Sequence, residues 1–488
     1  MKQKAYIIGS GFSSLSAACY LAKSGYDVTV LEKNEQLGGR AQVLRRDGFR
    51  FDMGPTWYWM PDVFEKFFAD FGKHPSQYYH LQRLSPAYSA HFNDGQRVDI
   101  GSRYRDIRNT FEGIETSAAA HLDAFMVEAK DNYVTAIGDL VYRPGESVFE
   151  LVGLRTLRRI RRFFTPITKD IRGRFKDARL KTILEFPVLF LGAKPADTPS
   201  FYSFMNYADF GMGTWYPQRG MYTVVEAMVS LATELGVSFQ TNAQVQRIEV
   251  KGNRVSGLKV GGQFKKADLV VSGADYYHTE KLLEEKFRHY SEKYWDSRTF
   301  APSALLFYIG FDKKLQDVNH HMLFFDADFE QHAQDIYDHP RWPDSPVFYA
   351  SFPSVTDSSC APHGQESAII LVPLALGLTD NEALRKEMFD KIIQRLEKNL
   401  TQPLSQHVVF WESFGSRDFC DRYNSYKGNA YGMANTLKQT AFLRPGLRSR
   451  KVKNLFFTGQ LTVPGPGIPP ALISGKLVAS LVQKYARP

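Results

Sequence analysis

The residues with the clearest chemical signal form a glycine-rich turn close to the N-terminus. The apolar run Tyr6-Ile7-Ile8 leads into Gly9-Ser10-Gly11-Phe12-Ser13-Ser14, and a stretch with helical character follows. Gly9 permits a tight turn, and Gly11 lets the backbone approach a pyrophosphate whose charge faces the N-terminal end of the helix. The order of strand, turn and helix therefore predicts the phosphate-binding turn of a dinucleotide site.

A carboxylate stands where such a site needs one. The next apolar run ends at Glu32, about 20 residues after Gly11, and Lys33 follows it. A carboxylate in this place accepts a hydrogen bond from a ribose hydroxyl and repels a 2′-phosphate. The third glycine of the fingerprint is replaced by Ser14, whose small side chain still permits close packing of helix on strand. We therefore expect these residues to bind a dinucleotide: Gly9, Ser10, Gly11, Ser14, Glu32 and Lys33.

A second glycine-rich segment lies near the C-terminus. Residues Asn454 to Gln460 predict an apolar strand that ends in a glycine turn, and Gly465-Pro466-Gly467-Ile468-Pro469-Pro470 follows. The apolar spacing then predicts a helix from Ala471 onward. Its N-terminal end suits anionic or polar cofactor oxygens. We therefore expect the chain to end inside the domain in which it begins.

The elements that must hold these motifs indicate an α/β fold with more than one domain, because 488 residues exceed one ordinary core. Met221 to Leu235 predicts a helix, and short strands follow it at Val237–Thr241, Val245–Val250, Val255–Val260 and Leu269–Ser272. Further buried strands are expected at Phe186–Ala193, Ala304–Phe311 and Ala368–Leu374. We predict a Rossmann-like nucleotide-binding domain from residues 1–75, 218–275 and 440–488, and a mixed α+β substrate domain from 76–110 and 276–439. Residues 111–217 are expected to form a mostly helical insertion.

The net charge of +9 suits nucleic acid, an anionic membrane or an acidic partner. Its distribution favours the membrane, because the basic segment from Arg155 to Lys176 interleaves arginines with Leu, Ile and Phe at helical spacing, broken at Pro166. Such a segment suits the interface of a bilayer. We therefore expect the insertion to face a membrane, and we expect no nucleic-acid partner.

Other classes of protein are disfavoured. Cys19, Cys360 and Cys420 have neither disulfide nor zinc-ligand spacing, and His320 and His321 are adjacent, so their side chains diverge; no metal site is expected. No run of about eighteen apolar residues predicts a transmembrane helix. The chain enters its first strand within a few residues, which predicts a cytoplasmic protein, bound peripherally to the membrane, without a signal peptide.

Taken together, the motifs resemble those of two-domain flavoprotein oxidoreductases related to amine oxidases, and most closely the bacterial-type phytoene and carotenoid desaturases. The resemblance covers essentially the whole chain. It rests on these blocks: Gly9 to Ser14 with Glu32, Gly38-Gly39-Arg40, Asp52-Met53-Gly54-Pro55, Gly220-Met221-Tyr222, and Thr458-Gly459 with Pro464 to Pro470. It implies FAD rather than NAD, and the sequence has no second glycine fingerprint that would seat a nicotinamide.

The resemblance also implies roles for individual residues. Gly39 and Arg40 would line the cofactor, with Arg40 hydrogen-bonding a phosphate or ribityl oxygen. Met53, Gly54 and Pro55 would approach the isoalloxazine ring, and the backbone of Val245 would meet the adenine. Three residues of the tail would close over the ribityl chain and flavin: Gly459, Gly467 and Ile468.

The substrate class implied by the resemblance is a lipophilic carotenoid, which needs an apolar tunnel beside the flavin. We expect the tunnel wall to include Tyr207, Phe210, Trp215 and Met221, together with Phe204 and Met205, and Asp209 is a candidate for assisting proton loss. Hydride transfer to the flavin would create C=C bonds in phytoene, or at the 3,4 bond of a hydroxycarotenoid, with oxygen or a quinone as the final electron acceptor. A redox-neutral isomerase, a saturase and a non-catalytic prenyl-lipid carrier are the alternatives.

Overall fold

A five-stranded parallel sheet forms the core of the nucleotide-binding part in the computed structural model, which describes residues 2–147, 160–436 and 439–486. Its strand order is β19-β13-β1-β2-β9, and every neighbouring pair is parallel. The bounds are β1 Lys4–Ile8, β2 Asp27–Leu31, β9 Ser238–Gln240, β13 Leu269–Ser272 and β19 Leu455–Phe457. The sheet therefore draws strands from the beginning, the middle and the end of the chain, as the sequence predicts.

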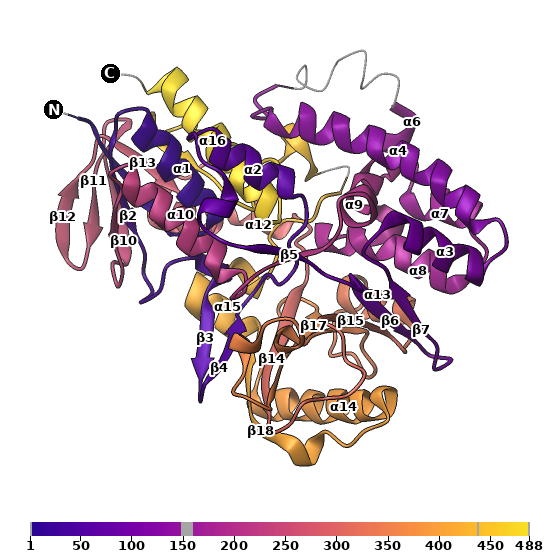
Figure 1. Ribbon diagram of the computed structural model, residues 1–488. Helices are drawn as coiled ribbons and strands as arrows, with labels where there is room; N and C mark the ends of the chain where they lie inside the picture. Colours follow the sequence, from indigo (N-terminus) through magenta and orange to yellow (C-terminus); the bar gives the residue numbers. More distant parts are fainter. Residues whose placement is uncertain (1, 148–159, 437–438, 487–488) are drawn as a thin grey trace.

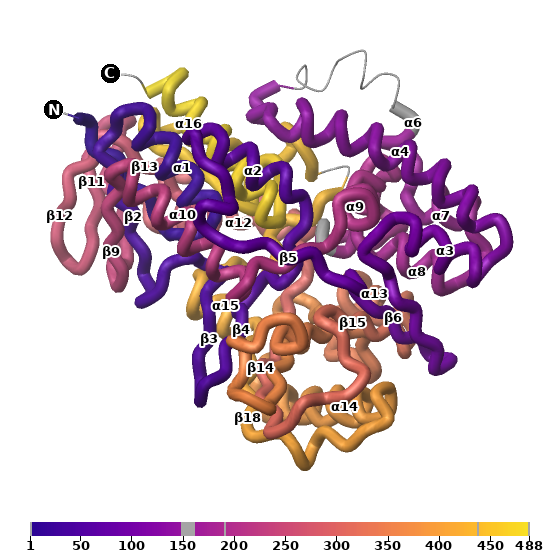
Figure 2. Tube along the Cα trace, viewed as in Figure 1, coloured from indigo at the N-terminus to yellow at the C-terminus, as the bar shows by residue number. Residues whose placement is uncertain are grey.

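Helices from the two ends of the chain lie side by side against this sheet (Figures 1 and 2). They are α1, Phe12–Lys23, and α16, Ile468–Tyr485, and α10, Tyr222–Glu234, also packs on α1. A Cβ at Gly475 in α16 would lie 2.5 Å from the carbonyl oxygen of Ser13, and the Ser16 hydroxyl donates to the Leu472 carbonyl over 2.7 Å. The glycine is thus what permits the two helices to approach so closely, and the C-terminal prediction is confirmed.

Smaller sheets flank this core. An antiparallel sheet contains β10 Val245–Lys251 and β11 Arg254–Val260, which agree with the predicted strands, and β12 Gln263–Lys266, which was not predicted. A hairpin of β3 Val43–Arg46 and β4 Phe49–Asp52 leads to α2, Pro61–Ala69. Strand β5, Leu81–Arg83, pairs with β8, Trp215–Pro217.

A seven-stranded mixed sheet dominates the second domain, at the bottom of Figure 1, in the order β18-β14-β17-β16-β15-β6-β7. The bounds are β6 Tyr88–Phe92, β7 Arg97–Ile100, β14 Ser303–Phe311, β15 His321–Phe325, β16 Phe348–Ser351, β17 Glu366–Leu374 and β18 Val408–Phe414. Side chains alternate across β14: Leu305 and Phe307 share a core with α14, Glu382–Leu400, whereas Ala304 and Leu306 face a cavity. One face of the sheet is therefore structural and the other forms the wall of a site. The shorter helices α13, Phe329–Tyr337, and α15, Ser416–Tyr423, adjoin this sheet, whereas α11, Tyr276–Lys281, and α12, Glu292–Asp296, pack with the five-stranded parallel sheet.

The predicted insertion is mostly helical where the structure describes it, apart from β8 at its C-terminal end. Its α-helices are α3 Tyr104–Ile114, α4 Ala118–Gly138, α6 Ile160–Phe164, α7 Ile167–Arg174, α8 Ala178–Glu185 and α9 Phe204–Asn206. The strand predicted at Phe186–Ala193 is wrong: Phe186–Leu191 forms a 3-10 helix, because a short apolar run is compatible with either structure when it is buried. No helix among the described residues is both long and apolar enough to span a bilayer.

The basic segment from Arg155 to Lys176 lies partly outside the described residues. In the described part, Pro166 separates α6 from α7 as predicted, but the side chains do not form one free amphipathic surface. Ile167 and Ile171 are buried in the core, and three arginines bind acidic side chains of the same molecule. These ion pairs join Arg162 to Glu128 and Asp131, Arg172 to Glu185 and Glu330, and Arg174 to Glu128 and Asp170.

Candidate active site

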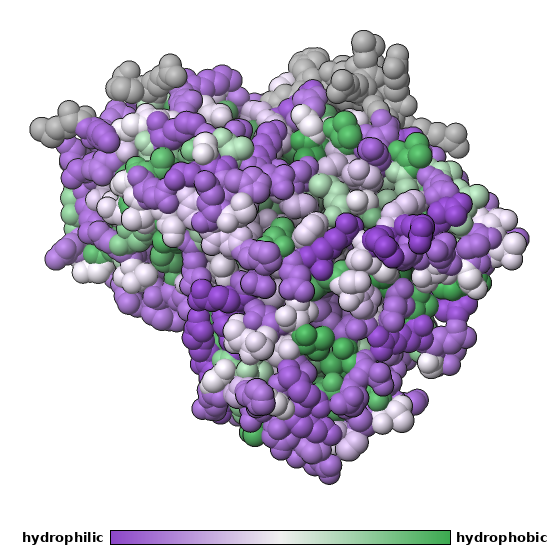
Figure 3. Space-filling model, viewed as in Figure 1, coloured by the Kyte–Doolittle hydropathy of each residue, from purple (hydrophilic) through white to green (hydrophobic). Residues whose placement is uncertain are grey.

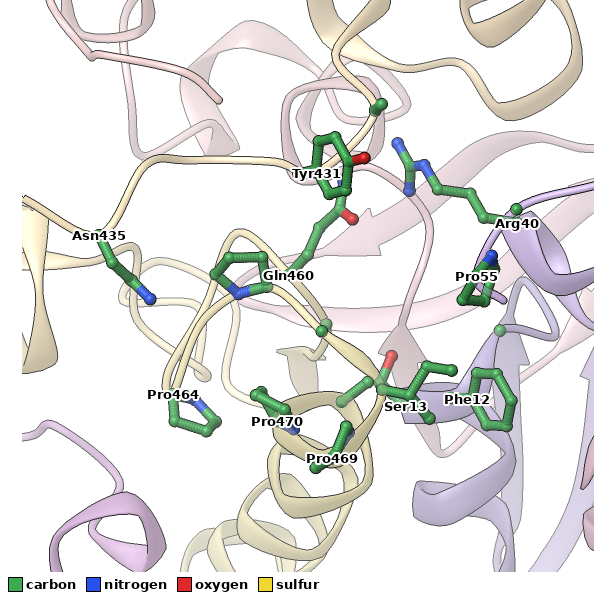
Figure 4. A pocket seen from close by; sticks show the side chains of 18 of the residues that line it. Phe12, Ser13, Arg40, Pro55, Tyr431, Asn435, Gln460, Pro464, Pro469 and Pro470 are labelled. Carbon is green, nitrogen blue, oxygen red and sulfur yellow. The ribbon is translucent and has the colours of Figure 1, made fainter. Parts of the chain in front are cut away.

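A cavity of about 650 Å³ connects the glycine motifs with an apolar region between the domains. One end is lined by the first phosphate-binding turn, the start of α16 and residues at the end of β2, and the other end by aromatic and aliphatic side chains. Figure 4 shows Phe12 and Ser13 of α1 on the same side of this space as Pro469 and Pro470 of α16. The two ends of the chain therefore build one site.

The first turn leaves room for a phosphate group. Gly9 has a φ of +86°, and a Cβ at Gly11 would meet no atom within 4 Å. Gly39, with a φ of +57°, passes so close to this turn that a Cβ added at Gly39 would lie 3.1 Å from the Gly11 Cα. The first N–H groups of α1 have no partner within the helix, so this open space is a ready site for the charge of a pyrophosphate.

Glu32 lies in the cavity wall beside this turn and is buried. Its carboxylate accepts from the Ser10 backbone N–H over 3.1 Å, from the Ser10 hydroxyl over 2.6 Å and from the Asn34 N–H over 2.9 Å. Val245 lines the same end, as predicted. Lys33 also lines the cavity, but its ammonium donates to the Asp421 carbonyl over 2.6 Å, and burial lowers its pKa. The carboxylate is thus held in a fixed orientation in the cavity wall.

Ser14 does not line the cavity, contrary to its assignment as a pyrophosphate residue. It is fully buried where α1 crosses the end of β13, and a Cβ at Gly273 would lie 2.0 Å from its hydroxyl oxygen. The space usually left by a third glycine on the helix is supplied here by a glycine on the strand side. The predicted close packing is therefore preserved by a different residue.

Arg40 lies at the middle of the cavity and points into it in Figure 4. A terminal nitrogen donates to the Ser425 hydroxyl and to the Asn429 carbonyl, 3.3 Å away, while Nε has no partner among the described residues. With its amide turned to accept, Gln460 places its oxygen 3.0 Å from both terminal nitrogens. Burial lowers the Arg40 pKa, and the Asp275 carboxylate opposes that change. An unsatisfied N–H on a buried cation suits an anionic cofactor.

The segment after β4 brings its backbone against Arg40. A Cβ at Gly54 would lie 2.2 Å from the Arg40 carbonyl oxygen, and Gly54 and Pro55 both line the cavity. Met53 does not line it: the Met53 carbonyl accepts from the Tyr308 hydroxyl over 2.9 Å, on the side of the mixed sheet. Gly54 and Pro55 thus remain candidates for the flavin ring, whereas Met53 secures the segment from behind.

The predicted tail residues Gly459, Gly467 and Ile468 all line the cavity. Gly459 has a φ of +108°, and Gly467, with a φ of +111°, precedes the first turn of α16. No motif in the sequence indicated Arg444, a buried guanidinium that binds five oxygens of this region. Its acceptors are the Thr462, Gln439, Met433 and Gln460 carbonyls and the Asn435 side chain, at 2.6 to 3.2 Å. Arg444 therefore ties the loop after β19 to the chain before it.

The apolar half of the cavity is walled mainly by residues that the sequence did not single out for this role. They include Trp57, Trp59, Phe186, Leu323, Phe325 and Val347. Phe204 and Met205 line it as predicted. The cavity thus offers an elongated apolar molecule a wall of rings and branched side chains.

Four predicted wall residues need correction, because none of them lines the cavity. Tyr207 packs on Tyr133, Phe210 packs on Phe111, and Trp215 belongs to β8 beside Arg83. Met221 is completely buried at the start of α10, where its N–H donates to Asp52 over 2.8 Å. These side chains fill the layer behind the wall, and the Gly220-Met221-Tyr222 block positions a helix rather than a substrate.

Asp209 also lies behind the wall, in a π-helical turn, Tyr207–Gly211, and is only 2% exposed. Tyr88 donates to its carboxylate over 2.9 Å, and Thr214 over 3.4 Å. Burial raises the Asp209 pKa to about 7, and the two hydrogen bonds oppose that rise. Asp209 does not line the cavity; the cavity-lining Trp59 donates to the Thr214 hydroxyl, which in turn donates to Asp209.

Comparison with known proteins agrees with this geometry. The model of the flavin containing amine oxidoreductase family matches residues 12–483. The carotenoid 3,4-desaturase of Haloarcula japonica is 41% identical over 98% of both chains, and the zeta-carotene-forming phytoene desaturase of Myxococcus xanthus is 32% identical over 98% of this chain and 94% of that protein.

Solved structures show the same fold at low sequence identity. An oxidoreductase from Methanosarcina mazei has a TM-score of 0.65 at 16% identity over 99% of this chain and 100% of that chain, and putrescine oxidase has a TM-score of 0.62 at 13% identity over 99% of each. The chain belongs to the flavin-containing amine oxidoreductase family. It is a flavin-dependent oxidoreductase, and the open space at Gly11 and the unpartnered Nε of Arg40 fit its cofactor, FAD.

Proposed function

We propose that the protein is an FAD-dependent carotenoid desaturase that introduces C=C bonds into a polyene. The observation that carries the proposal is the single cavity, in which a dinucleotide site continues into an apolar wall containing Trp57, Trp59 and Phe186. Two relatives that match almost the whole chain are named as desaturases of carotenoids. Bound flavin supplies the acceptor for a hydride from a saturated carbon.

The protein's own residues hold and enclose the reactants. The N-terminal end of α1, Glu32 and Arg40 would hold the cofactor at one end, and Gly54 and Pro55 would lie against its ring. The apolar wall orients a polyene that has no polar handle and excludes water from the reacting carbons. Positioning and desolvation are therefore the main contributions of the wall.

Anaerobic mixing with a polyene tests this function. We expect the visible absorbance of oxidised flavin to bleach while the absorption of the polyene moves to longer wavelength. A shift in double-bond geometry without bleaching identifies a redox-neutral isomerase, and activity only with pre-reduced flavin identifies a saturase. Binding of polyene with no change in either chromophore identifies a carrier, and each of these three results refutes the desaturase.

A second candidate substrate, a hydroxylated carotenoid oxidised at its 3,4 bond, is favoured by two tyrosines of the cavity. Tyr337 and Tyr431 line the cavity, and neither hydroxyl makes a hydrogen bond within residues 2–147, 160–436 and 439–486. Burial alone raises the pKa of Tyr431 to about 12, and burial, followed by the nearby Tyr431, raises the pKa of Tyr337. A hydroxyl that a hydrocarbon substrate covers without pairing costs about 1–3 kcal/mol, whereas a hydroxylated substrate offers it a hydrogen-bond partner.

Substrate preference measures this choice. If a hydroxyl is recognised, kcat/KM of the wild type favours the hydroxylated polyene over its hydrocarbon analogue, and Tyr431→Phe reduces that preference about 10-fold. Equal preference in wild type and variant assigns the protein to hydrocarbon substrates of the phytoene type.

We further propose that the protein takes its substrate from a membrane. Phe164 is 71% exposed beside the cavity-lining Phe163, and Leu443 is 41% exposed beside the cavity-lining Phe442. Val127 and Val134 add exposed apolar surface on α4, where Figure 3 shows hydrophobic residues at the surface. Since Arg162, Arg172 and Arg174 of the basic segment form ion pairs within the molecule, these exposed apolar residues are the stronger support for peripheral binding to a bilayer. Oxygen or a membrane quinone would reoxidise the flavin. Measurements of oxygen consumption and of quinone reduction during turnover distinguish these two electron acceptors.

A further inference from the structure

The cavity wall beside Pro55 contains a connected series of groups that can carry a proton. The Thr56 hydroxyl lies 2.7 Å from the Tyr349 hydroxyl, which lies 2.7 Å from Nδ1 of His321. Thr56 and Tyr349 line the cavity, whereas His321 is completely buried behind them. The hydrogen bonds therefore lead without a break from the cavity surface to a buried imidazole.

The fold places this series next to the cofactor half of the cavity. His321 begins β15, and Tyr349 lies in β16 opposite Leu323, so Tyr349 and His321 are diagonal neighbours on one face of the sheet. Thr56 follows Pro55 and Gly54, and the Gly54 backbone packs against the Arg40 backbone. The Tyr349 hydroxyl thus stands between the flavin-facing segment and the apolar wall.

The surroundings of His321 keep the imidazole neutral between turnovers, so that Nδ1 is available to accept from the Tyr349 hydroxyl. Burial, and then the adjacent His320, lower the pKa of His321. Trp57 stacks on the ring with 4.1 Å between centroids and an interplanar angle of 12°, and an aromatic face stabilises a cation. No carboxylate contacts the ring among the described residues: His320 lies 4.5 Å away, with Tyr216 and Asp357 behind it. Nε2 has no partner in this part of the chain either, so the series ends at His321.

We propose that Tyr349 is the proton acceptor of the desaturation and that His321 acts through it. Desaturation breaks two C–H bonds and forms one C=C bond; one hydrogen leaves as hydride to the oxidised flavin, and the other leaves as a proton. The Tyr349 oxygen takes up that proton while its own hydroxyl hydrogen passes to Nδ1 of His321, which becomes imidazolium against Trp57. The proton returns by the same path to the cavity after the product leaves. This inference rests on the proposed desaturase function.

Single-turnover bleaching of the FAD-loaded protein by a polyene under anaerobic conditions tests it. We expect Tyr349→Phe to slow bleaching by about 100-fold or more, which is the range of general acid–base catalysis. Flavin content and the dissociation constant of the polyene remain at wild-type values. Tyr79→Phe is the matched control, because it removes a buried hydroxyl that lies 2.8 Å from the Tyr58 hydroxyl outside the cavity, and it leaves the rate unchanged.

A second variant separates a relay from simple structural support. His321→Gln retains an acceptor for the Tyr349 hydroxyl but does not take up a proton, so it slows bleaching similarly, and the double variant is no slower than the slower single variant. Should Tyr349→Phe lose its flavin, His321→Gln carries the test alone. Wild-type rates in the variants, or losses that multiply, overturn the relay and leave the desaturase function standing. A wild-type flavin that no polyene bleaches overturns both.

Discussion

Replacing Asp209 with asparagine separates a structural carboxyl group from a catalytic one. Asp209 is only 2% exposed, and burial raises its pKa from the ordinary 3.8 to about 7. The folded state therefore binds a proton that the unfolded chain has released, and stability falls as the pH rises from about 4 to about 7. At pH 8 this difference in pKa lowers the free energy of unfolding by about 4 kcal/mol. About 3 kcal/mol of that loss of stability occurs between pH 5 and pH 8.

Asparagine reproduces the protonated acid, because its oxygen accepts from Tyr88 and its amide nitrogen donates to Thr214. The free energy of unfolding of wild type should fall by about 3 kcal/mol from pH 5 to pH 8 because Asp209 ionises, whereas that of Asp209→Asn should not. The stability of the variant relative to wild type should therefore rise by about 3 kcal/mol over this range. Urea denaturation of the FAD-loaded protein at the two pH values measures this change. Asp344→Asn is the control, since Asp344 is exposed.

The same variant answers the catalytic question. Because Asp209 does not line the cavity, flavin bleaching in Asp209→Asn should keep its wild-type rate within a factor of about three, well below the loss of about 100-fold expected for an essential base. A difference in stability that does not change with pH refutes the buried-acid argument. A loss of bleaching with intact stability refutes the structural assignment instead.

Four further perturbations test the cofactor site and the exposed apolar residues. Glu32→Ala should raise the FAD dissociation constant about 10-fold or more by removing the ribose acceptor, and undiminished affinity in a fluorescence titration contradicts that role. Gly11→Val should leave the fold intact by circular dichroism and abolish flavin content, because its side chain enters open space in the phosphate site. Gly273→Ala should lower the melting temperature, and adding Ser14→Gly should recover most of the loss; a loss of the same size with and without the Ser14 side chain disproves the proposed contact. Phe164→Glu should reduce flotation with lipid vesicles even at high salt, whereas binding that only salt reverses assigns the contact to charge.

The cofactor half of the site was predictable because its signals are local. Gly9, Gly11 and Glu32 act through turn geometry and through their spacing on one strand–helix–strand unit, which does not depend on the remainder of the fold. Ser14 shows the limit of such reasoning. Its compensating Gly273 lies far away in sequence and becomes its neighbour only when β13 joins the sheet.

The apolar wall was not predictable in the same way, because it forms where separate domains meet. Trp57, Tyr58 and Trp59 are consecutive, yet Trp57 and Trp59 line the cavity, whereas Tyr58 does not line it and stacks on the cavity-lining Phe64. In an extended chain, successive side chains point to opposite sides, so Tyr58 points away from Trp57 and Trp59. Which of the two sides faces the cavity depends on where the mixed sheet lies. Composition therefore identifies aromatic candidates without separating the wall from the layer behind it, which is where Phe210 is found.

The cofactor half and the apolar half of the site are built from different structural elements. This difference affects how substitutions can change the choice of substrate. The cofactor half rests on α1 and α16, which pack together through Gly475 and are buried against the parallel sheet. The wall instead combines β-strands, short helices and the region around α4, so single substitutions there alter the shape of the cavity without disturbing the nucleotide turn. Tyr349 joins the halves, since it lies on β16 in the cavity wall and its hydroxyl lies 2.7 Å from the hydroxyl of Thr56, the residue after Pro55. A change of bond selectivity is therefore expected to arise in the wall, with the Tyr349–His321 pair retained.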